Sequence, residues 1–545
     1  MQEHLKKIIL DSDSRGEFFL FNQIADPASP DRGALVRSFN MPQPKTTIYG
    51  LTTLLALYLT PGSAFFRSPR ALAGVEAGLA YVERSQRPGG TFDLPDCNFA
   101  SAPDTAFCVK RLLPVCRLLM QRGECPELLA RIRRVMEKAA EGIAAGGFHT
   151  PNHRWAIASV LTVCSQLFDR PAFRGKAEEY LREGIDCAES GEYSERSAGN
   201  YNRINNDAML LLYEETGDET YLETVRRNLK MMFCYFEPDG SIFTGNSTRY
   251  DSGLKVYPKD YYFEYLYMAW KTGDPEFAAA ANRIMADQAA RGERAPDCLA
   301  LLLTHPALLD YEPQGCAYPQ AYRRNFAGSG IVRVRDGAWS CSVLAGHPDF
   351  FRFQSGALRA RVRIGMSFFE KRLFEASSIT EKDGVYTLKA DWKGWFYKPL
   401  AEKPATSDWW AMDQSKREIA PGPALSASVE IAQIEDGVSL RFHTRGCDRV
   451  PFKIVVSVDP GAFIRADGFL CEARPCAALA VKSGMLTIAR GADGIEIGPA
   501  FASHFFVEGK EGGDRGSEAL CSLYFTGYTS ADRTITFRRL HGLFQ

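Results

Sequence analysis

Residues 328–346, GSGIVRVRDGAWSCSVLAG, mark the point at which the sequence changes from one kind of secondary structure to another. Two short runs rich in β-branched and aromatic residues flank Asp336-Gly337, a dipeptide typical of tight hairpin turns. The stretch therefore predicts two antiparallel strands. The sequence before it is arranged instead in longer segments with helical periodicity.

Strand-like text continues from this stretch to the end of the chain. The segments PFKIVVSVD (451–459) and DRTITFRRL (532–540) repeat the pattern, and Asp383-Gly384 and Asp436-Gly437 supply further turn signals. Many short strands without intervening helices are typical of an antiparallel β-sandwich. We therefore expect a β-sandwich domain over residues 319–545.

The preceding part of the chain, residues 1–318, reads as a series of amphipathic helices separated by short Gly, Pro or Asp punctuation. Paired, these helices form five or six hairpins of roughly 40 to 50 residues. Such hairpins stack as an open solenoid or close as an (α/α) toroid, and periodicity alone does not decide between them. The expected helices are 46–59, 69–86, 103–121, 126–145, 152–167, 174–186, 199–216, 219–236, 260–272 and 276–291.

Composition limits the possible partners. The chain has 545 residues, 45% hydrophobic and 24% charged, with a formal net charge of -1, as in globular proteins of two or three domains. Without a global basic field, nucleic acid and anionic membranes are not the expected partners. The N-terminal text contains no signal-peptide core and no window long enough to span a membrane, which predicts a cytoplasmic protein. Oligomeric state is not determined by these features.

The fourteen cysteines are scattered, with no CxxC pair and no spacing typical of a zinc finger. Several of them, such as Cys108, Cys116 and Cys164, lie within apolar helical text. We expect free thiols in a reducing compartment, no metal site and no cofactor.

A first candidate site lies in GFHTPNHRW, residues 147–155. Thr150 is suited to the N-cap and Pro151 to the first helical position, which places Asn152 and His153 in the first turn. The positive end of a helix attracts a carboxylate and disfavours a protonated imidazole, so a neutral His153 could act as a base. The alternative is that these residues only decorate a helix terminus.

A second candidate site lies in SGEYSERSAGNYNRINNDAMLLLYEETG, residues 190–217, where asparagines crowd the start of a helix that they do not favour. Tyr201 and Asn205 share one helical face, and Glu195 and Asp207 belong to the same segment. A polar, aromatic helix entrance is costly for stability alone. This cost favours a ligand-facing mouth.

Two further segments have the same character. DCNFASAPDTAFC, residues 96–108, places Asn98 and Asp104 around a helix start, and DGSIFTGNSTRYDSG, residues 239–253, places Arg249 and Tyr250 in a loop. Arg249 could hold a carboxylate with two parallel hydrogen bonds. A solvated loop arginine is the alternative.

The β-domain contains an aromatic cluster in residues 391–417, which include Trp392, Trp395, Trp409 and Trp410 among the seven tryptophans of the chain. Aromatic clusters on loops form packed interfaces or platforms for sugar rings. Trp395, Trp409 and Trp410 are therefore candidate substrate-binding residues, on a loop that could close one end of a cleft.

Taken together, these motifs resemble the heparinase II/III-like polysaccharide lyases, which include alginate and oligoalginate lyases. The resemblance rests on the Asn-His pair in TPNHRW and on GEYSERSAGNYN, which is similar to the family's Glu-containing loop that ends in the catalytic tyrosine. It implies an (α/α) toroid followed by a β-sandwich, and β-elimination at a uronic acid. By the resemblance, Asn152 neutralises the C6 carboxylate with help from Arg249. His153 and Tyr201 divide the base and acid roles, and Tyr201 protonates the leaving oxygen.

One region departs from that family. Many relatives carry a His-Gly-His and Asp constellation that supplies a further catalytic histidine and a structural zinc. This chain has LAGHPDFF, residues 344–351, with the single histidine His347. His347 stays a candidate catalytic residue, and the zinc site is not expected.

Two other functions compete with the lyase. A glycoside hydrolase would use two carboxylic acids from Asp104, Glu195, Asp207 and Asp251. A non-catalytic carbohydrate-binding protein would need only the aromatic cluster. The leading expectation is a uronate-specific lyase that acts exolytically on imported oligosaccharides.

Overall fold

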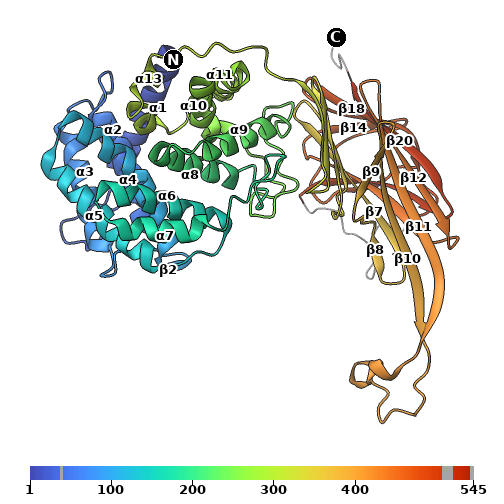
Figure 1. The fold of residues 1–545 in the computed structure, drawn as a ribbon. Helices are drawn as coiled ribbons and strands as arrows, with labels where there is room; N and C mark the ends of the chain where they lie inside the picture. Colours follow the sequence, from blue (N-terminus) through green and yellow to red (C-terminus); the bar gives the residue numbers. More distant parts are fainter. Residues whose placement is uncertain (37–40, 506–518, 541–545) are drawn as a thin grey trace. The chain divides into compact units, whose positions relative to one another are not determined.

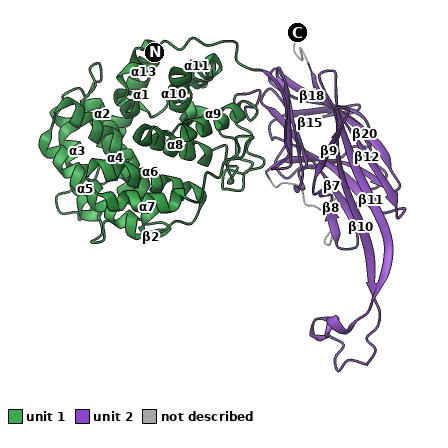
Figure 2. Cartoon of the chain, viewed as in Figure 1, with its two compact units in different colours: residues 1–235, 240–319 green, residues 236–239, 320–545 purple. Residues whose placement is uncertain are grey.

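The computed structural model describes residues 1–36, 41–505 and 519–540. The chain divides into two compact units, which Figure 2 shows in different colours. The first unit comprises residues 1–235 and 240–319, and the second comprises residues 236–239 and 320–545.

The first unit is built from helices that pack as antiparallel neighbours (Figure 1). Proline occupies the first position of several of them, where its missing N–H is not needed. The helices are α1 (Gln2–Phe21), α2 (Pro44–Tyr58), α3 (Pro69–Ser85), α4 (Ala102–Arg122), α5 (Pro126–Ala145), α6 (Pro151–Leu167), α7 (Pro171–Leu181), α8 (Tyr201–Thr216), α9 (Glu219–Phe233), α10 (Tyr262–Thr272), α11 (Pro275–Ala290), α12 (Leu299–Leu303) and α13 (Pro306–Leu309). A small hairpin of β1 (Phe92–Leu94) and β2 (Asn98–Ser101) precedes α4.

Alternate helices of this unit play different roles. α2, α4, α6 and α8 pack against one another in succession, and α6 is buried at nearly every position from Arg154 to Cys164. α5 is buried only along one face, which includes Leu128, Ile132 and Val135. This arrangement of inner helices with amphipathic outer ones confirms the expected (α/α) toroid.

The structure corrects some of the expected helix boundaries. α7 begins at Pro171 and ends at Leu181, whereas 174–186 was expected, because the chain turns out of the helix before Gly184, which has a φ of 77°. The helix α1 was not expected. It buries polar residues such as Asp11 and Ser12 beside Ile8 and Phe19, which obscures its helical periodicity in the sequence.

The second unit is an antiparallel β-sandwich, as expected. One sheet has the order β15-β14-β17-β18-β20-β12-β11-β10-β9, and the other has β16-β19-β13-β7-β6-β5-β4-β3 with β8 paired to β7. The strands pair antiparallel, except that β16 pairs with β19 in parallel within the described residues. The strands are β3 (Ala321–Phe326), β4 (Ile331–Asp336), β5 (Trp339–Leu344), β6 (Phe351–Ser355), β7 (Leu358–Phe368), β8 (Lys371–Leu373), β9 (Ile379–Lys382), β10 (Val385–Tyr397), β11 (Ile419–Ile434), β12 (Gly437–Gly446), β13 (Pro451–Val458), β14 (Phe463–Ala466), β15 (Phe469–Glu472), β16 (Ala478–Ala480), β17 (Ser483–Arg490), β18 (Asp493–Phe501), β19 (Cys521–Tyr528) and β20 (Asp532–Leu540).

Alternating side chains of the two sheets form the core of the sandwich. Val362 and Ile364 of β7 belong to the same buried cluster as Val429 of β11 and Leu440 of β12. Between β9 and β10, Asp383 and Gly384 both have positive φ, as a two-residue hairpin turn requires. The turn signal in the sequence therefore corresponds to a hairpin.

The hairpin of β10 and β11 extends beyond the rest of its sheet in Figure 1. Its outer part carries Trp395, which pairs with Pro421, and the segment at its end contains Trp409 and Trp410 in a short 3-10 turn. Trp395 therefore lies on a strand, whereas the sequence had indicated a loop. Gly394 and the Pro421-Gly422-Pro423 run, which are unusual in strands, concealed this extension.

All fourteen cysteines lie in the described part of the chain and are free thiols. Among the described residues, no helix is both long enough and apolar enough to cross a membrane.

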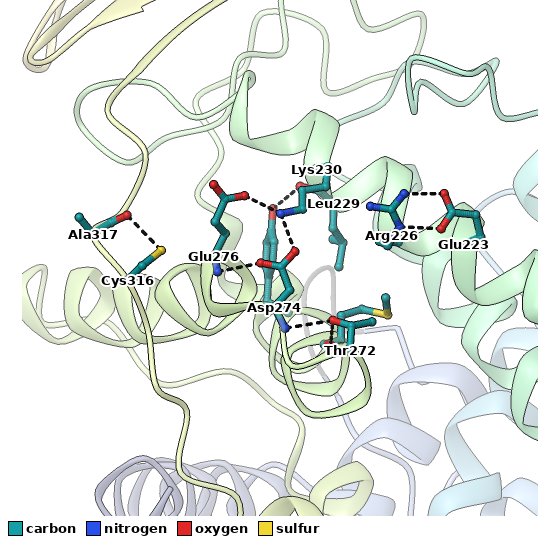
Figure 3. A network of polar contacts seen from close by, with 11 residues as sticks. Glu223, Arg226, Leu229, Lys230, Thr272, Asp274, Glu276, Cys316 and Ala317 are labelled. Carbon is teal, nitrogen blue, oxygen red and sulfur yellow. Dashed lines mark hydrogen bonds and ion pairs between the residues drawn. The ribbon is translucent and has the colours of Figure 1, made fainter.

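A lysine on α9 connects that helix to the start of α11 (Figure 3). Lys230 Nζ contacts Asp274 at 2.6 Å and also contacts Glu276, while Asp274 caps α11 by accepting from the N–H of Glu276. Arg226, one turn earlier, forms its ion pair with Glu223 of its own helix. The two neighbouring ion pairs thus differ in whether they join separate helices.

Replacing Lys230 with alanine should lower the free energy of unfolding by about 1 kcal/mol, because two carboxylates lose their shared cation. Arg226→Ala, the matched control, should cost less than about 0.5 kcal/mol, as is usual for a surface pair within one helix. Urea unfolding of both variants measures the difference. Equal losses would show that the bridge between α9 and α11 contributes nothing beyond a surface pair.

Candidate active site

The first unit contains a cavity of about 760 Å³. Its walls come mainly from α4 and α8, with Lys45 and Tyr49 from α2 and Arg249 from the loop that follows α9. Five of the candidate residues line it, namely Asn98, Asp104, His153, Tyr201 and Arg249. The structure therefore brings residues from four separate sequence motifs to one site.

Polar stripes on two inner helices form much of the cavity wall. On α4 the lining residues include Asp104, Lys110 and Arg117, and on α8 they include Asp207 and Glu214. These positions recur at helical spacing, so each stripe lies on one face. Lys110 of α4 contacts Asp207 of α8 at 3.5 Å, which links the two walls.

The first turn of α6 binds a buried carboxylate. The backbone N–H of Asn152 donates to Glu195 Oε2 at 3.0 Å, and Asn152 Nδ2 donates to Glu195 and, at 2.9 Å, to Thr150 Oγ1. The positive end of α6 therefore holds a carboxylate, as the sequence had suggested, but the carboxylate belongs to the protein. Asn152 is fully buried and does not line the cavity.

Glu195 connects Asn152 to the cavity through Arg249. Arg249 Nε lies 3.2 Å from Glu195 Oε1, and the guanidinium lies over the Tyr201 ring, 5.3 Å from its centroid. Burial raises the pKa of Glu195, although the bonds from Asn152 and the charge of Arg249 oppose that shift. A chain of contacts thus runs from Asn152 through Glu195 and Arg249 to Tyr201.

A second buried carboxylate fixes the loop that leads into α8. Asp251 accepts hydrogen bonds from Ser197 Oγ at 2.8 Å, Gly199 N at 3.0 Å and Ser247 Oγ at 2.5 Å. A Cβ atom at Gly199 would lie 2.7 Å from Asp251 Oδ2, so only glycine permits this approach. Asp251 therefore binds the segment before Tyr201 to the segment that carries Arg249.

The asparagines at the start of α8 have different surroundings. Asn206 accepts from Tyr193 at 3.0 Å and donates to Asn228 and Glu264, each at 2.9 Å, in a buried network. Asn205 is also fully buried and lies outside the cavity wall. Of the four asparagines in this segment, only Asn200 lines the cavity.

His153 enters the cavity from the first turn of α6. Burial lowers its pKa to about 4, with nearby positive charges of Lys45 and Arg249 acting in the same direction and Asp104 opposing. Its ring packs against the edge of Phe107, and its Nδ1 is buried without a hydrogen-bond partner among the described residues. His153 is consequently neutral at pH 7.

Beside His153, Asp104 is held in its ionised form. It accepts from Lys45 Nζ at 2.9 Å, Ser101 Oγ at 2.7 Å and Asn98 Nδ2 at 3.4 Å. Burial alone would raise the pKa of Asp104, but Lys45 and these hydrogen bonds outweigh it and lower the pKa. This carboxyl is therefore suited to binding and poorly suited to donating a proton.

Another part of the cavity wall contains His305, a histidine whose pKa is shifted in the opposite direction to that of His153. His305 Nε2 lies 2.7 Å from Glu214 Oε1, and its Nδ1 lies 2.7 Å from the carbonyl oxygen of Leu301. Burial lowers the pKa of His305, yet Glu214 outweighs burial and the net shift is upward. Because both ring nitrogens face acceptors, the doubly protonated ring fits this environment.

Other candidate residues lie apart from the cavity wall. Tyr250 is 68% exposed and packs edge-on against Tyr201, without lining the cavity. His347 lies in the second unit, in the turn between β5 and β6, and Trp395, Trp409 and Trp410 belong to the β10–β11 hairpin of that unit. Catalytic or binding roles for these five residues stay predictions.

Several cavity residues were not singled out in the sequence. They include Lys45, Tyr49, Lys110, Arg111, Arg117, Arg203, Glu214, Asp260, Asp297 and His305. The signal for those on α4 was a run of charged residues at helical spacing within an otherwise apolar helix. That signal was lost because a polar stripe is ordinarily the solvent-facing side of an amphipathic helix.

In residues 1–36, 41–505 and 519–540, no group of three or more histidine, cysteine, aspartate or glutamate side chains has the arrangement of a metal site.

The fold is shared with solved polysaccharide lyases. The chain is similar to Paenibacillus xanthan lyase (TM-score 0.60, 10% identity, covering 98% of this chain and 57% of that one). It is also similar to heparinase III (TM-score 0.57, 10% identity, 97% and 85%) and to the Streptomyces coelicolor A3 chondroitin AC lyase (TM-score 0.54, 13% identity, 98% and 79%).

The chain has a heparinase-like polysaccharide lyase fold. It spans little more than half the length of the xanthan lyase. No protein-family model matches the sequence, and no curated protein matches it. At this level of identity the comparisons establish the architecture, and the chemistry has to be argued from the site.

The pKa values of the two cavity histidines should be shifted in opposite directions from that of free histidine. The pKa of His153 is lowered to about 4 from 6.5, so its contribution to stability is full above pH 6.5 and is lost as the pH falls toward 4. The pKa of His305 is raised, so its contribution is full below pH 6.5 and is lost as the pH rises through the raised value.

Imidazole NMR titration measures both pKa values, with His153→Gln and His305→Gln used to assign the signals. At pH 6 we expect His153 to be neutral and His305 to be protonated. Titration of both rings near pH 6.5 would contradict the environments described for them.

Proposed function

We propose that this protein is a lyase that cleaves uronate-containing oligosaccharides by β-elimination. The observation that carries the proposal is the grouping of neutral His153, Tyr201 and Arg249 at one cavity. β-Elimination requires neutralisation of the C6 carboxylate, removal of the C5 proton and protonation of the departing O4. The cavity offers a group for each of these requirements.

Arg249 is the proposed ligand of the substrate carboxylate. It lines the cavity and is partly exposed, and its planar guanidinium suits paired hydrogen bonds to a carboxylate. Both Nδ2 hydrogens of Asn152 are already directed to Glu195 and Thr150. We therefore propose that Asn152 acts through Glu195, as a positioning residue for Arg249, in place of the direct contact that the family resemblance implies.

Tyr201 and His153 are the proposed proton-transfer groups. Tyr201 lines the cavity beneath the Arg249 guanidinium, so a substrate whose carboxylate is bound by Arg249 would lie close to the phenol hydroxyl, the proposed proton donor to O4. A ring with a pKa of about 4 is a weak base at pH 7, so His153 acts best after a substrate carboxylate has raised that pKa. Removal of the C5 proton then leaves a double bond between C4 and C5 as the C4–O4 bond breaks.

The carboxyl groups of the site favour elimination over hydrolysis. A hydrolase needs one carboxylic acid that keeps its proton near neutral pH beside a second that is ionised. Asp104 lines the cavity with a lowered pKa, and Asp207 is paired with Arg203 at 2.8 Å. Glu195 has a raised pKa, but it is buried beneath Arg249 and does not line the cavity.

Incubation with chondroitin, heparan and alginate oligosaccharides should generate unsaturated chain ends that absorb ultraviolet light. New reducing ends without that absorbance would show hydrolysis and reject the proposal. On a long polymer we expect exolytic release of one short product from the start. An early series of mixed lengths would contradict exolytic action while leaving the lyase chemistry intact.

Tyr201→Phe removes only the phenol hydroxyl and should lower turnover by about a hundredfold or more, the usual contribution of a general acid or base. Unfolding free energy and substrate affinity should change little. Tyr221→Phe on α9, outside the cavity wall, is the matched control and should retain full turnover. Equal activity of the two variants would exclude the proton-transfer role of Tyr201.

A further inference from the structure

We propose that the cavity is built for uronate oligosaccharides that carry carboxylates but no sulfate groups. This inference rests on the lyase function proposed above and specifies its substrate class. It follows from the ion pairs in the cavity, in which the positive charges are already neutralised by carboxylates of the protein. Among the described residues, six lysine and arginine side chains line the cavity, and each of them contacts a carboxylate of the protein.

Pairing between α4 and α8 neutralises the helical walls. Asp207 lies 2.8 Å from Arg203 and 3.5 Å from Lys110. Arg117 contacts both Glu214, at 3.4 Å, and Glu215. The side chains of Lys110, Arg117 and Arg203 are each less than one third exposed. Water therefore screens their ion pairs less than it screens ion pairs on the surface.

The remaining lining charges are also balanced. Arg111 lies 2.5 Å from Asp297, and Lys45 lies 2.9 Å from Asp104. Asp260 adds one further carboxylate to the wall, and its charge acts on Arg203. An added sulfate would therefore have to displace a protein carboxylate from its cation and leave that carboxylate without a partner, which is costly in a partly desolvated site.

The ion pair of Arg249 with Glu195 can separate to let Arg249 bind one anion of the substrate. Arg249 is shared with Glu195, a carboxyl whose pKa is raised by burial. When a substrate carboxylate approaches Arg249, Glu195 can take up a proton and release the guanidinium without leaving a buried negative charge. The carboxylates of Asp104 and Glu214 lack this release, since their pKa values are lowered despite their burial. Burial raises the pKa of Glu215, but Arg117 also contacts Glu214 and stays paired there. The cavity thus has room for one carboxylate at Arg249 and for uncharged sugar surface elsewhere.

The test compares unsulfated and sulfated tetrasaccharides that share one backbone, using chondroitin and heparan backbones. The unsulfated member should have a kcat/KM at least about tenfold higher, because a sulfate would have to displace a protein carboxylate from its cation. Equal or faster turnover of the sulfated member would overturn the inference and leave the lyase function standing.

Calorimetric binding to Tyr201→Phe gives a readout that does not depend on turnover. The unsulfated tetrasaccharide should bind more tightly, and tighter binding of the sulfated one would overturn the inference even if no lyase activity were found. Absence of unsaturated products from every substrate, by contrast, would reject the proposed function itself. The two failures are therefore distinguishable.

Asp297→Asn provides a charge-specific variant. It removes the carboxylate partner of Arg111, which stays held by Thr53 at 3.1 Å and Thr52 at 3.2 Å. The preference for the unsulfated substrate should shrink by about threefold, the worth of one partly exposed charge pair. Asp310→Asn, an exposed position outside the cavity wall, is the matched control and should leave the preference unchanged. An unchanged preference in Asp297→Asn would contradict the charge-balance explanation.

Discussion

The buried carboxylate of Glu195 is the interaction on which the arrangement of the site depends. It accepts from the backbone N–H and the side-chain amide of Asn152 at the start of α6, and it contacts Arg249 from the loop after α9. A buried carboxylate without these partners would be strongly destabilising, so the two segments that supply them are held together. Asp251 joins the same loop to the segment that enters α8. The positions of Arg249 and Tyr201 follow from these two carboxylates.

The inner helices explain why the cavity is charged. α4 and α8 are surrounded by other helices, so their polar stripes cannot be directed to bulk solvent as those of α5 are. Partly buried ion pairs such as Arg117 with Glu214 rarely stabilise a protein more than apolar packing would. Their presence along a cavity wall fits the polar oligosaccharide that we propose as the substrate. The same pairing limits how much additional negative charge that ligand can carry.

Much of the fold could be predicted from the sequence, because it depends on local patterns. Helical periodicity with proline at the first position located α6, and Asp383-Gly384 located a hairpin turn. The helix α1 escaped detection because Asp11 is buried, where it accepts from the backbone N–H of Ala295 at 2.7 Å, a contact 284 residues away. Trp395 was placed on a loop because glycine and proline interrupt its strand pattern.

The candidate site was predictable only in part, because some of its contacts join residues that are far apart in the sequence. Motif chemistry singled out His153, Tyr201 and Arg249, which the cavity brings together. The pairing of Asn152 with Glu195 joins residues 43 positions apart, and no local pattern encodes it. In the sequence, Asn152 and Glu195 each looked like a group that faces a ligand, whereas in the structure they form hydrogen bonds with each other.

A crystal structure of the Tyr201→Phe variant with a bound unsulfated uronate tetrasaccharide tests the account most directly. The account predicts that the uronate carboxylate contacts the Arg249 guanidinium, with the C5 hydrogen directed toward His153 or the ring at position 201. It also predicts that Asn152 keeps its bonds to Glu195. A tetrasaccharide bound with its glycosidic oxygen between Asp104 and Asp207, and with Arg249 still paired only to Glu195, would contradict the account.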